Sequence, residues 1–353
     1  MHKLKKIFLL SMLISVSPSI WAQATCDPAG DVEFICGLMN AEDLVQVPES
    51  DWIISSAMIP NTGFYLIDAN TGASQTPDIR TNHDQERYPL CASSPDMNRL
   101  ETHGLNIRAT GRNHATLYAV AHGARESIEI YDVDTSDGVP QLTWRGCVAM
   151  PEGLAANSVA SFADGSIVTT VLLMPGKSFG DSVAMRPTGA VFKWIPGERE
   201  FIHIENSELP GNNGIEVSAD GSEIYVVSSG FQTIVAFSNT NPARQLRTTQ
   251  QLPITPDNVH MDSNGMLLTG GMKNEVPECG GPPGPQHDLA ALGTCPRGSI
   301  AIEINPGTMA VKVLVETPAL SEFSNATMVL NTGNRLWFGT FSGDRIAYLN
   351  QAE

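Results

Sequence analysis

Short stretches of alternating apolar and polar residues, separated by tight turns, follow one another through most of the chain. In NGIEVSADGSEIYVV, which starts at Asn213, an alternating strand runs to Asp220-Gly221 and a second apolar strand follows. Asp-Gly supplies the positive φ angles of a tight hairpin turn. The pattern therefore predicts a β-hairpin with polar residues at the start of its first strand.

This unit occurs six times at irregular intervals, beginning at Glu42, His103, Asn157, Asn213, Asp257 and Asn325. A third alternating strand follows most copies, as in FYLIDAN and TIVAFSN, and a fourth follows several. Helical periodicity with caps is almost absent. Six four-stranded repeats predict an all-β, six-bladed β-propeller. A two-sheet sandwich is the alternative all-β fold, but it does not explain six copies of one unit.

The sixth copy stops after its third strand, at the end of the chain. We expect the N-terminal segment around DVEFICGL to supply the missing outer strand and close the ring.

The first strand of each blade lines the central channel of a propeller, so the polar residues that open the six units should meet at one mouth of the channel. We expect a single site surrounded by Glu42, His103, Asn157, Asn213, Asp257 and Asn258. Carboxylate and amide oxygens suit a hard cation, and calcium takes six to eight oxygen ligands. The alternative is that these residues satisfy strand ends and solvate the channel.

The first 24 residues have the features of a secretory signal: Lys3, Lys5 and Lys6, an apolar run from Ile7 to Val16, and the small-residue end Ala22-Gln23-Ala24. The run is too short to span a bilayer, and no second one follows. We therefore expect a signal peptide over 1–24 and a propeller over 25–353, in a periplasmic or secreted protein.

Six cysteines in an exported chain favour disulfides: Cys26, Cys36, Cys91, Cys147, Cys279 and Cys295. Cys279 and Cys295 bracket one Pro/Gly-rich loop and form the favoured pair, whereas the other pairings stay open. The formal net charge is −17 and no Lys/Arg cluster occurs outside the signal, which argues against nucleic-acid binding. The sequence does not indicate an oligomeric state.

The order and spacing of several segments resemble the paraoxonase/arylesterase family, with gluconolactonase-like propellers as more distant relatives. These segments include AEDLVQVPESDWIISSAM, THGLNIR, LYAVAHGARESIEIYDVD, NNGIEVSADGSEIYVV and PDNVHMDSNGMLLTGG, and the resemblance covers most of the mature chain. It implies a catalytic calcium ion held by Glu42, Asn157, Asn213, Asp257 and Asn258. It also implies that His103 activates water with the help of His122, and that a second, structural calcium ion uses Asp43 and the Leu105 carbonyl.

Two departures from the family pattern matter. Ser158 stands where paraoxonases have an Asp that binds the structural calcium ion, which places the second ion in doubt. The chain end YLNQAE lacks the cysteine that closes the paraoxonase ring, so closure should rest on strand pairing alone.

These features predict an exported calcium-dependent hydrolase of small-molecule esters or lactones, in which the metal polarises the carbonyl and water attacks it. Loops near 172–189 and 272–298 should lie over the channel mouth and favour hydrophobic lactones or aryl esters. The motif Gly176-Lys177-Ser178-Phe179-Gly180 fits a nucleophile elbow formally but lacks the strand and helix that an elbow needs. Two alternatives stay open: a non-catalytic, calcium-stabilised propeller that binds a ligand or partner protein, and a sugar-lactone hydrolase of gluconolactonase type.

Overall fold

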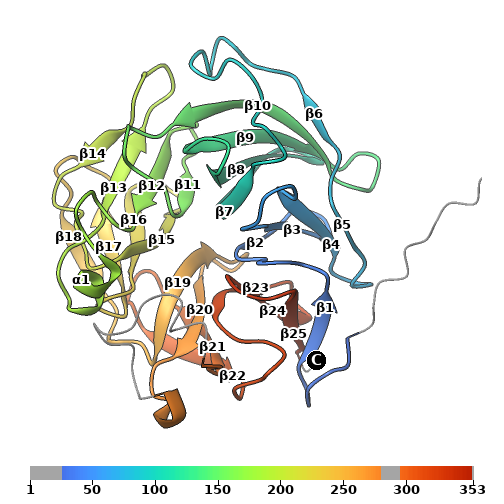
Figure 1. The fold of residues 1–353 in the computed structure, drawn as a ribbon. Coiled ribbons are helices and arrows are strands. Elements are labelled where there is room, and N and C mark those ends of the chain that lie inside the picture. Colours follow the sequence, from blue (N-terminus) through green and yellow to red (C-terminus); the bar gives the residue numbers. More distant parts are fainter. Residues whose placement is uncertain (1–25, 280–294, 352–353) are drawn as a thin grey trace, which may run out of the picture.

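Six β-sheets stand around a central axis like the blades of a propeller (Figure 1). The computed structural model describes residues 26–279 and 295–351. The predicted signal peptide and most of the second predicted lid loop lie outside these residues. Among the described residues, no helix is long and apolar enough to cross a membrane.

Each blade is a four-stranded antiparallel unit whose first strand lies nearest the axis. Blade 1 contains β2 (Leu44–Gln46), β3 (Trp52–Ser56), β4 (Phe64–Asp68) and β5 (Ser74–Gln75). Blade 2 contains β7 (Glu101–Gly111), β8 (His114–His122), β9 (Ser127–Asp134) and β10 (Gln141–Ala149). Blade 3 contains β11 (Val159–Ser161), β12 (Ile167–Val171), β13 (Ala190–Trp194) and β14 (Ile202–Ile204).

Blade 4 contains β15 (Asn212–Val217), β16 (Glu223–Ser228), β17 (Thr233–Ser238) and β18 (Gln245–Thr248). Blade 5 contains β19 (Ile254–Met261), β20 (Leu267–Lys273), β21 (Ser299–Ile304) and β22 (Val311–Glu316). Blade 6 contains β23 (Ala326–Asn331), β24 (Arg335–Thr340) and β25 (Arg345–Asn350), with β1 (Glu33–Cys36) outermost. The prediction of an all-β six-bladed propeller is confirmed.

The ring closes as the sequence predicts, by strand pairing between the two ends of the chain. β1 pairs antiparallel with β25, with Glu33 opposite Tyr348. The Glu33 carboxylate accepts hydrogen bonds from Tyr348 Oη at 2.6 Å and from Asn350 Nδ2 at 2.7 Å. Blade 6 is therefore a joint product of residues more than 300 positions apart.

Apolar side chains pack between neighbouring blades because the middle strands of each blade are covered on both faces. β12 is buried along its whole length, and it packs with Val120 and Ile128 of blade 2 and with Phe192 of β13. A strand that is buried on both faces needs a nearly continuous apolar run rather than strict alternation. The second strands of the repeats show such runs.

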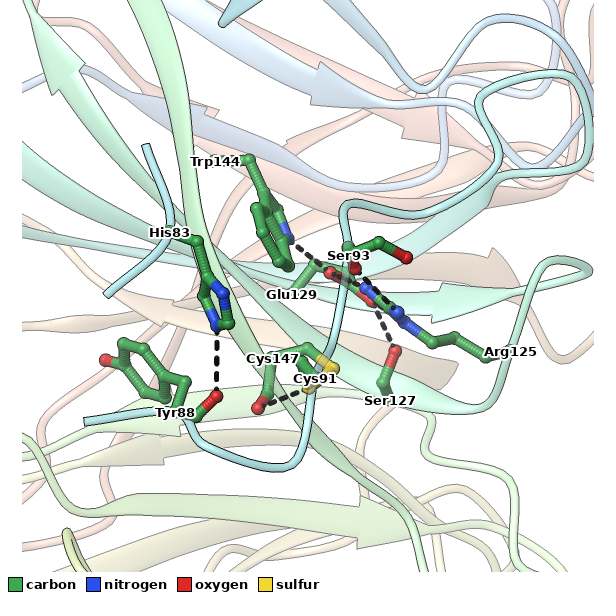
Figure 2. Close-up of a disulfide and its surroundings, with 9 residues drawn as sticks. All are labelled: His83, Tyr88, Cys91, Ser93, Arg125, Ser127, Glu129, Trp144 and Cys147. Atoms are coloured by element: carbon green, nitrogen blue, oxygen red, sulfur yellow. Dashed lines mark hydrogen bonds and ion pairs between the residues drawn. A yellow bond between two sulfur atoms is a disulfide. The ribbon is translucent and has the colours of Figure 1, made fainter. Parts of the chain in front are cut away.

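Blade 2 differs from the others by its long strands and by a fifth one. β6 (Ile79–Thr81) pairs parallel to β10 at the outer edge. On β9 of the same blade, the buried Glu129 carboxylate accepts hydrogen bonds from Arg125, Ser127 and Trp144 (Figure 2). This arrangement satisfies a charge that would otherwise be costly to bury.

Three disulfides connect all six cysteines: Cys26 with Cys36, Cys91 with Cys147, and Cys279 with Cys295. The predicted pairing of Cys279 with Cys295 is confirmed. Figure 2 shows the second bridge, which ties the segment before β7 to the outer strand β10. None of the three links the last strand to the first blade, so closure of the ring depends on pairing between β1 and β25.

Helix α1 (Phe179–Val183) lies within the first predicted lid loop. Ser178 is its N-cap: the hydroxyl accepts a hydrogen bond from the Asp181 amide, and the Asp181 side chain accepts one from the Ser178 amide. The serine of the formal elbow motif therefore caps a short surface helix, which explains its place in the sequence without a nucleophilic role.

Candidate metal centre and active site

The polar residues that open the blades lie at irregularities of strand pairing. The register shifts between Thr102 and Leu105, between Asn212 and Ile215, and between Pro256 and Val259. The residues inside these gaps are His103-Gly104, Asn213-Gly214 and Asp257-Asn258. A β-bulge redirects side chains and interrupts the ladder. Four of the predicted site residues, His103, Asn213, Asp257 and Asn258, are thus freed from regular pairing at the place where their blades approach the axis.

Two glycines within these bulges allow neighbouring blades to come together. A Cβ atom on Gly104 would lie 2.5 Å from Ser158 Cα, and one on Gly214 would lie 2.5 Å from the Asp257 carbonyl oxygen. Neither glycine has a positive φ angle, so the requirement is for space rather than for backbone freedom. The His-Gly and Asn-Gly pairs therefore combine a functional side chain with a close contact to the next blade.

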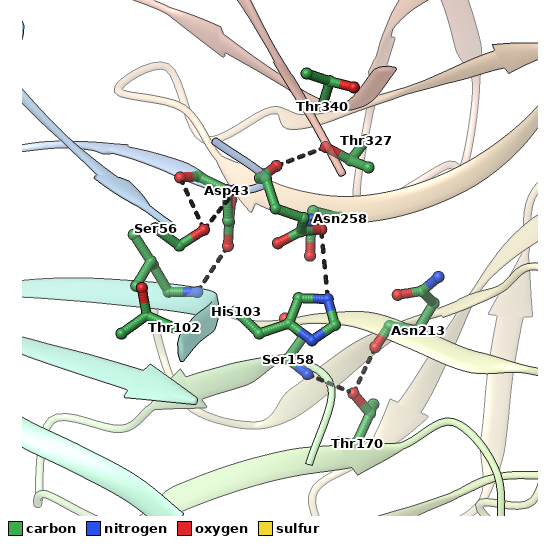
Figure 3. Close-up of polar contacts among 12 residues, drawn as sticks. Asp43, Ser56, Thr102, His103, Ser158, Thr170, Asn213, Asn258, Thr327 and Thr340 are labelled. Carbon is green, nitrogen blue, oxygen red and sulfur yellow. Dashed lines mark hydrogen bonds and ion pairs between the residues drawn. The ribbon is translucent and has the colours of Figure 1, made fainter. Parts of the chain in front are cut away.

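Glu42, just before blade 1, and Asn258 of blade 5 meet near the central axis. Asn258 Nδ2 donates a hydrogen bond to Glu42 Oε1, and His103 Nε2 lies 3.7 Å from the same oxygen. Figure 3 shows the His103 ring between Asn258 and Ser158, with Asn213 beyond it. The structure thus brings together side chains from blades 1, 2, 4 and 5.

Three buried oxygens at the predicted metal site have no hydrogen-bond partner among the described residues: Glu42 Oε2, Asn157 Oδ1 and Asn213 Oδ1. Two further unpartnered buried oxygens, Ser158 Oγ and Asn325 Oδ1, belong to residues at the openings of blades 3 and 6. An unsatisfied buried oxygen costs free energy, and a bound cation removes that cost. The donor set fits a hard cation such as calcium.

Only two of the predicted catalytic-calcium ligands, Glu42 and Asp257, are carboxylates. Within the described segments, accordingly, no group of three or more His, Cys, Asp and Glu side chains has an arrangement that could hold a metal ion. A site here would depend on amide oxygens for much of its coordination. The assignment of the five residues as ligands stays a prediction.

Burial and mutual repulsion raise the pKa values of the two carboxyl groups at this point. Burial raises the pKa of Asp257 to about 7; the Asn213 amide partly offsets this effect, and Asp43 adds to it. Burial also raises the pKa of Glu42, and the charges of Asp257 and Asp43 raise it further. Without a cation, this cluster therefore retains protons in the neutral range. A divalent ion would supply the missing positive charge.

Threonine hydroxyls fix the backbone around the site. Thr170 Oγ1 donates to the Asn213 carbonyl at 2.5 Å, and Thr269 Oγ1 donates to the Asn258 carbonyl at 2.7 Å. Thr327 Oγ1 donates to the Glu42 carbonyl at 2.5 Å. Each bond joins a predicted ligand to a strand, so these three positions are held by the sheets; Figure 3 shows the bonds made by Thr170 and Thr327.

His103 and His122 form the start of a chain that leads outward. His103 Nδ1 lies 3.3 Å from His122 Nε2, and His122 Nδ1 lies 2.7 Å from Glu126 Oε2. The sequence predicted the two histidines but not Glu126, because the glutamate sits in a surface turn where acidic residues are common. The only hint in the sequence was that Glu126 follows His122 by four residues, close enough for the two side chains to pair across a turn.

The environment of His103 changes its expected acid-base behaviour. An unperturbed imidazole titrates near pH 6.5. Burial lowers the pKa of His103 to about 3, and the neighbouring His122 contributes to the shift. His103 is therefore neutral at physiological pH, with a lone pair available on one ring nitrogen, but it is a weaker base than a free histidine.

Asp43, the other predicted metal-binding carboxylate, has a different environment from Glu42. Its Oδ1 accepts from the Leu44 amide at 2.9 Å and lies 2.7 Å from His260 Nε2. Its Oδ2 accepts from the Leu105 amide at 2.7 Å. It is thus the N–H of Leu105 that faces Asp43, whereas the resemblance implied a role for the Leu105 carbonyl.

The sequence interpretation also missed Asn325 and His260. Asn325 opens the sixth repeat, and alignment of the six units places it with Asn157 and Asn213. His260 gave no comparable signal because it looks like an ordinary polar position in an alternating strand.

A groove of about 830 Å³ lies beside the predicted metal site, between blades 4 and 5. Ser229 connects the groove with the site: it lines the groove, and its hydroxyl accepts a hydrogen bond from Asn213 Nδ2 at 3.1 Å. Phe179 and Val183 of α1 form part of the wall, and Gln232, Lys273 and Glu316 add polar groups. The first predicted lid loop therefore lies on the same face as Asn213.

No protein-family model matches the sequence, and no curated protein is similar to it. Similar solved structures include a luciferin-regenerating enzyme, with a TM-score of 0.54 and 13% identity over 91% of this chain and 95% of the other. A structural-genomics protein provisionally classed as a gluconolactonase has a TM-score of 0.53 and 14% identity over 92% and 93%. The calcium-binding protein regucalcin from Agrobacterium tumefaciens has a TM-score of 0.50 and 10% identity over 89% and 90%. At these identities the likeness shows that the fold is shared, while the expected kinship with paraoxonases stays a prediction.

Proposed function

We propose that the protein is an exported calcium-dependent hydrolase of lactones or carboxylic esters. The observation that carries this proposal is the set of buried oxygens on Glu42, Asn157 and Asn213 that have no partner among the described residues, together with the position of His103 beside Glu42. Neighbours of the same fold include a provisional gluconolactonase and a calcium-binding protein, which makes both elements of the proposal reasonable for this architecture.

Glu42, Asn157, Asn213, Asp257 and Asn258 would hold the ion. When bound, calcium would supply Lewis-acid polarisation of a carbonyl oxygen. The fixed backbone around these residues would keep the amide oxygens pointed at one position, which reduces the reorganisation that the reaction requires. The Glu42 carboxylate is buried, so the groups that face the substrate carbonyl lie in a site of low dielectric constant.

His103 would accept the proton of the attacking water at Nε2, the ring nitrogen that faces Glu42. Because the pKa of His103 is low, the proton needs a route away from the site. His103 Nδ1, His122 and Glu126 offer that route, and the Glu126 side chain is 42% exposed to solvent. In this scheme His122 and Glu126 orient His103 and carry its proton to water.

The side chains that line the groove favour a substrate with an apolar part. Leu252 and Ile300 line it together with α1, and Met185, at 58% exposure, stands at its edge. Phe231, in the turn between β16 and β17, is 42% exposed on the same face. Exposed apolar side chains around a cleft are typical of a site for an apolar ligand. We therefore favour aryl esters and hydrophobic lactones over sugar lactones.

Three disulfides fit an oxidising compartment and support the proposal of export. The predicted signal peptide lies outside the described residues, so its cleavage has to be measured on the secreted or periplasmic protein by N-terminal sequencing. Cleavage after Ala24 is the expected result.

The activity is tested with the mature protein, stripped of metal by a chelator and then supplied with calcium. Phenyl acetate, a long-chain lactone and gluconolactone would serve as substrates. We expect turnover of the first two only with calcium. Turnover of gluconolactone alone would favour the sugar-lactone alternative, and calcium binding without any turnover would favour a non-catalytic binding propeller.

A further inference from the structure

His260 lies two residues after Asn258 on β19, the innermost strand of blade 5. Both of its ring nitrogens face carboxylates. Nε2 lies 2.7 Å from Asp43 Oδ1, and Nδ1 lies 3.9 Å from Glu216 Oε2. The residue is only 9% exposed. The His260 ring therefore stands between the two carboxylates, within hydrogen-bond distance of Asp43 and farther from Glu216.

The residues around Asp43 do not fit a second calcium ion. Both oxygens of the Asp43 carboxylate already accept hydrogen bonds, from the backbone of Leu44 and Leu105 and from His260. The Glu216 oxygens accept from the amides of Val217 and Met261, at 2.8 Å and 3.1 Å. This environment contrasts with that of Glu42, whose Oε2 has no partner among the described residues.

Two features act in the same direction. Ser158 stands where the resemblance implies a carboxylate at the second ion, so that oxygen donor is missing. His260 Nε2 lies 2.7 Å from Asp43 Oδ1, so a calcium ion bound by this oxygen would have to displace the His260 ring.

We propose that the His260 side chain takes the structural place of a second metal ion and joins the blades across the axis, so that the chain binds a single calcium ion. His260 belongs to blade 5, Asp43 precedes blade 1, Leu105 belongs to blade 2 and Glu216 to blade 4. The contacts of His260 with Asp43 and Glu216, together with the hydrogen bond from the Leu105 amide to Asp43, therefore connect four blades. The inference rests on the proposed function for the identity of the ion at Glu42 and Asn258. Its account of the position beside Asp43 does not depend on that function.

Counting ions tests this inference. The mature protein is stripped of metal and dialysed to equilibrium against calcium, and bound calcium per chain is measured for wild type and for the double variant Ser158→Asp/His260→Ala. We expect one ion in the wild type and one more in the double variant. Two ions in the wild type, or no increase in the double variant, would overturn the inference. Absence of any ion in the wild type would contradict the proposed function, while a gain of one in the double variant would still support the role of His260.

Thermal unfolding in the presence of a chelator provides a second measurement that does not require the double variant to fold well. His260→Ala should lower the melting temperature, because it removes the hydrogen bond between His260 and the buried Asp43 carboxylate. His114→Ala is the matched control, since the pair between His114 and Asp134 spans 3.8 Å at the surface with about half of each side chain exposed. Equal melting temperatures for His260→Ala and wild type would contradict the role of His260 as a lock between blades.

Discussion

Asn258 donates a hydrogen bond to Glu42 Oε1, although 216 residues separate the two positions in the chain. The bond exists because the first and fifth blades reach the axis at the same mouth, and Glu42 Oε2 beside it has no hydrogen-bond partner within the described part of the chain. Asn258 thereby orients the carboxylate without neutralising it. Burial and the charges of Asp257 and Asp43 raise the pKa of Glu42, and the hydrogen bond from Asn258 only partly offsets them.

Calcium binding is expected to release protons. Without the ion, Asp257 has a pKa of about 7 and that of Glu42 is raised, so at pH 6 the cluster holds protons that the ion must displace. Titration calorimetry at pH 6 in buffers of different ionisation enthalpy should show the release of at least about one proton per ion, which is the proton of Asp257. This part of the release should be lost at pH 9, well above the pKa of Asp257. A binding enthalpy that is independent of the buffer at pH 6 would contradict the prediction.

The same shifts predict how pH affects the calcium-free protein. The folded-state pKa of Asp257 is raised above the unfolded value of about 3.9, so the folded chain binds more protons than the unfolded chain between these two values. The contribution of this group to the free energy of unfolding is therefore largest below about pH 4 and is lost as the pH rises to about 7. In urea titrations with a chelator, Asp257→Asn should remove this part of the pH dependence, and an unchanged profile would contradict the assignment.

Replacement of Gly214 by alanine should damage the site by steric pressure alone. The added Cβ would lie 2.5 Å from the Asp257 carbonyl oxygen and 2.7 Å from Asn258 Cα, so the backbone of blade 5 must move. We expect weaker calcium binding and a loss of about 1–3 kcal/mol in the free energy of unfolding. Gly111→Ala is the control, because nothing lies within 4 Å of its added Cβ. Similar calcium affinities for the two variants would show that close approach at Gly214 is not required.

The fold could be predicted from the sequence because the repeated unit has a local signal. Alternation fixes which residues face the core, and turns such as Asp220-Gly221 fix where strands end, so six copies suffice to indicate six blades. The closing role of β1 was predicted because the sixth copy has only three strands, so its fourth strand had to come from the N-terminal segment. The fifth strand of blade 2 gave no such signal, because β6 has only three residues and pairs with a strand more than 60 positions away.

The candidate site was predictable only in part, for a physical reason. Residues such as Asn213 and Asp257 share a position in the repeat, and the propeller symmetry brings equivalent positions to one point on the axis. The repeat position of His260 holds Glu216 in blade 4 and Asn106 in blade 2, so it predicts no common role, and Glu126 lies in a turn outside the repeated strands. The roles of His260 and Glu126 depend on the side chains that face them from neighbouring elements. The neutral state of His103 was also beyond sequence analysis, because it follows from burial.

Glu126 should affect turnover through the orientation of His122. Glu126→Gln keeps a hydrogen-bonding oxygen but removes the charge that receives the proton, so we expect kcat to fall by about 10-fold with little change in KM. Removal of a general base itself typically costs 100-fold or more, which is the larger loss expected for His103→Ala. The measurement is kcat and KM on phenyl acetate as a function of pH.

The matched control for Glu126 is Glu208→Gln, since Glu208 also pairs with a histidine, His203, at 3.0 Å. That pair lies at the surface, with 39% and 42% of the two side chains exposed, and contacts none of the predicted site residues. Equal kinetic effects of the two substitutions would show that Glu126 has no specific role in the chain from His103.

Closure of the ring should be sensitive to Glu33. The Glu33 carboxylate accepts hydrogen bonds from both Tyr348 and Asn350 on β25, and no disulfide reinforces this junction. Glu33→Ala removes both bonds and leaves the half-buried Tyr348 hydroxyl without its acceptor, which should cost about 1–3 kcal/mol in the free energy of unfolding. Glu303→Ala is the control, because its partner Lys312 lies 3.4 Å away and is mostly exposed. An exposed pair of this kind contributes about 1 kcal/mol or less. Urea unfolding of the two variants distinguishes the cases: if Glu33→Ala is no less stable than Glu303→Ala, then the ring is held by backbone pairing and apolar packing without help from this carboxylate.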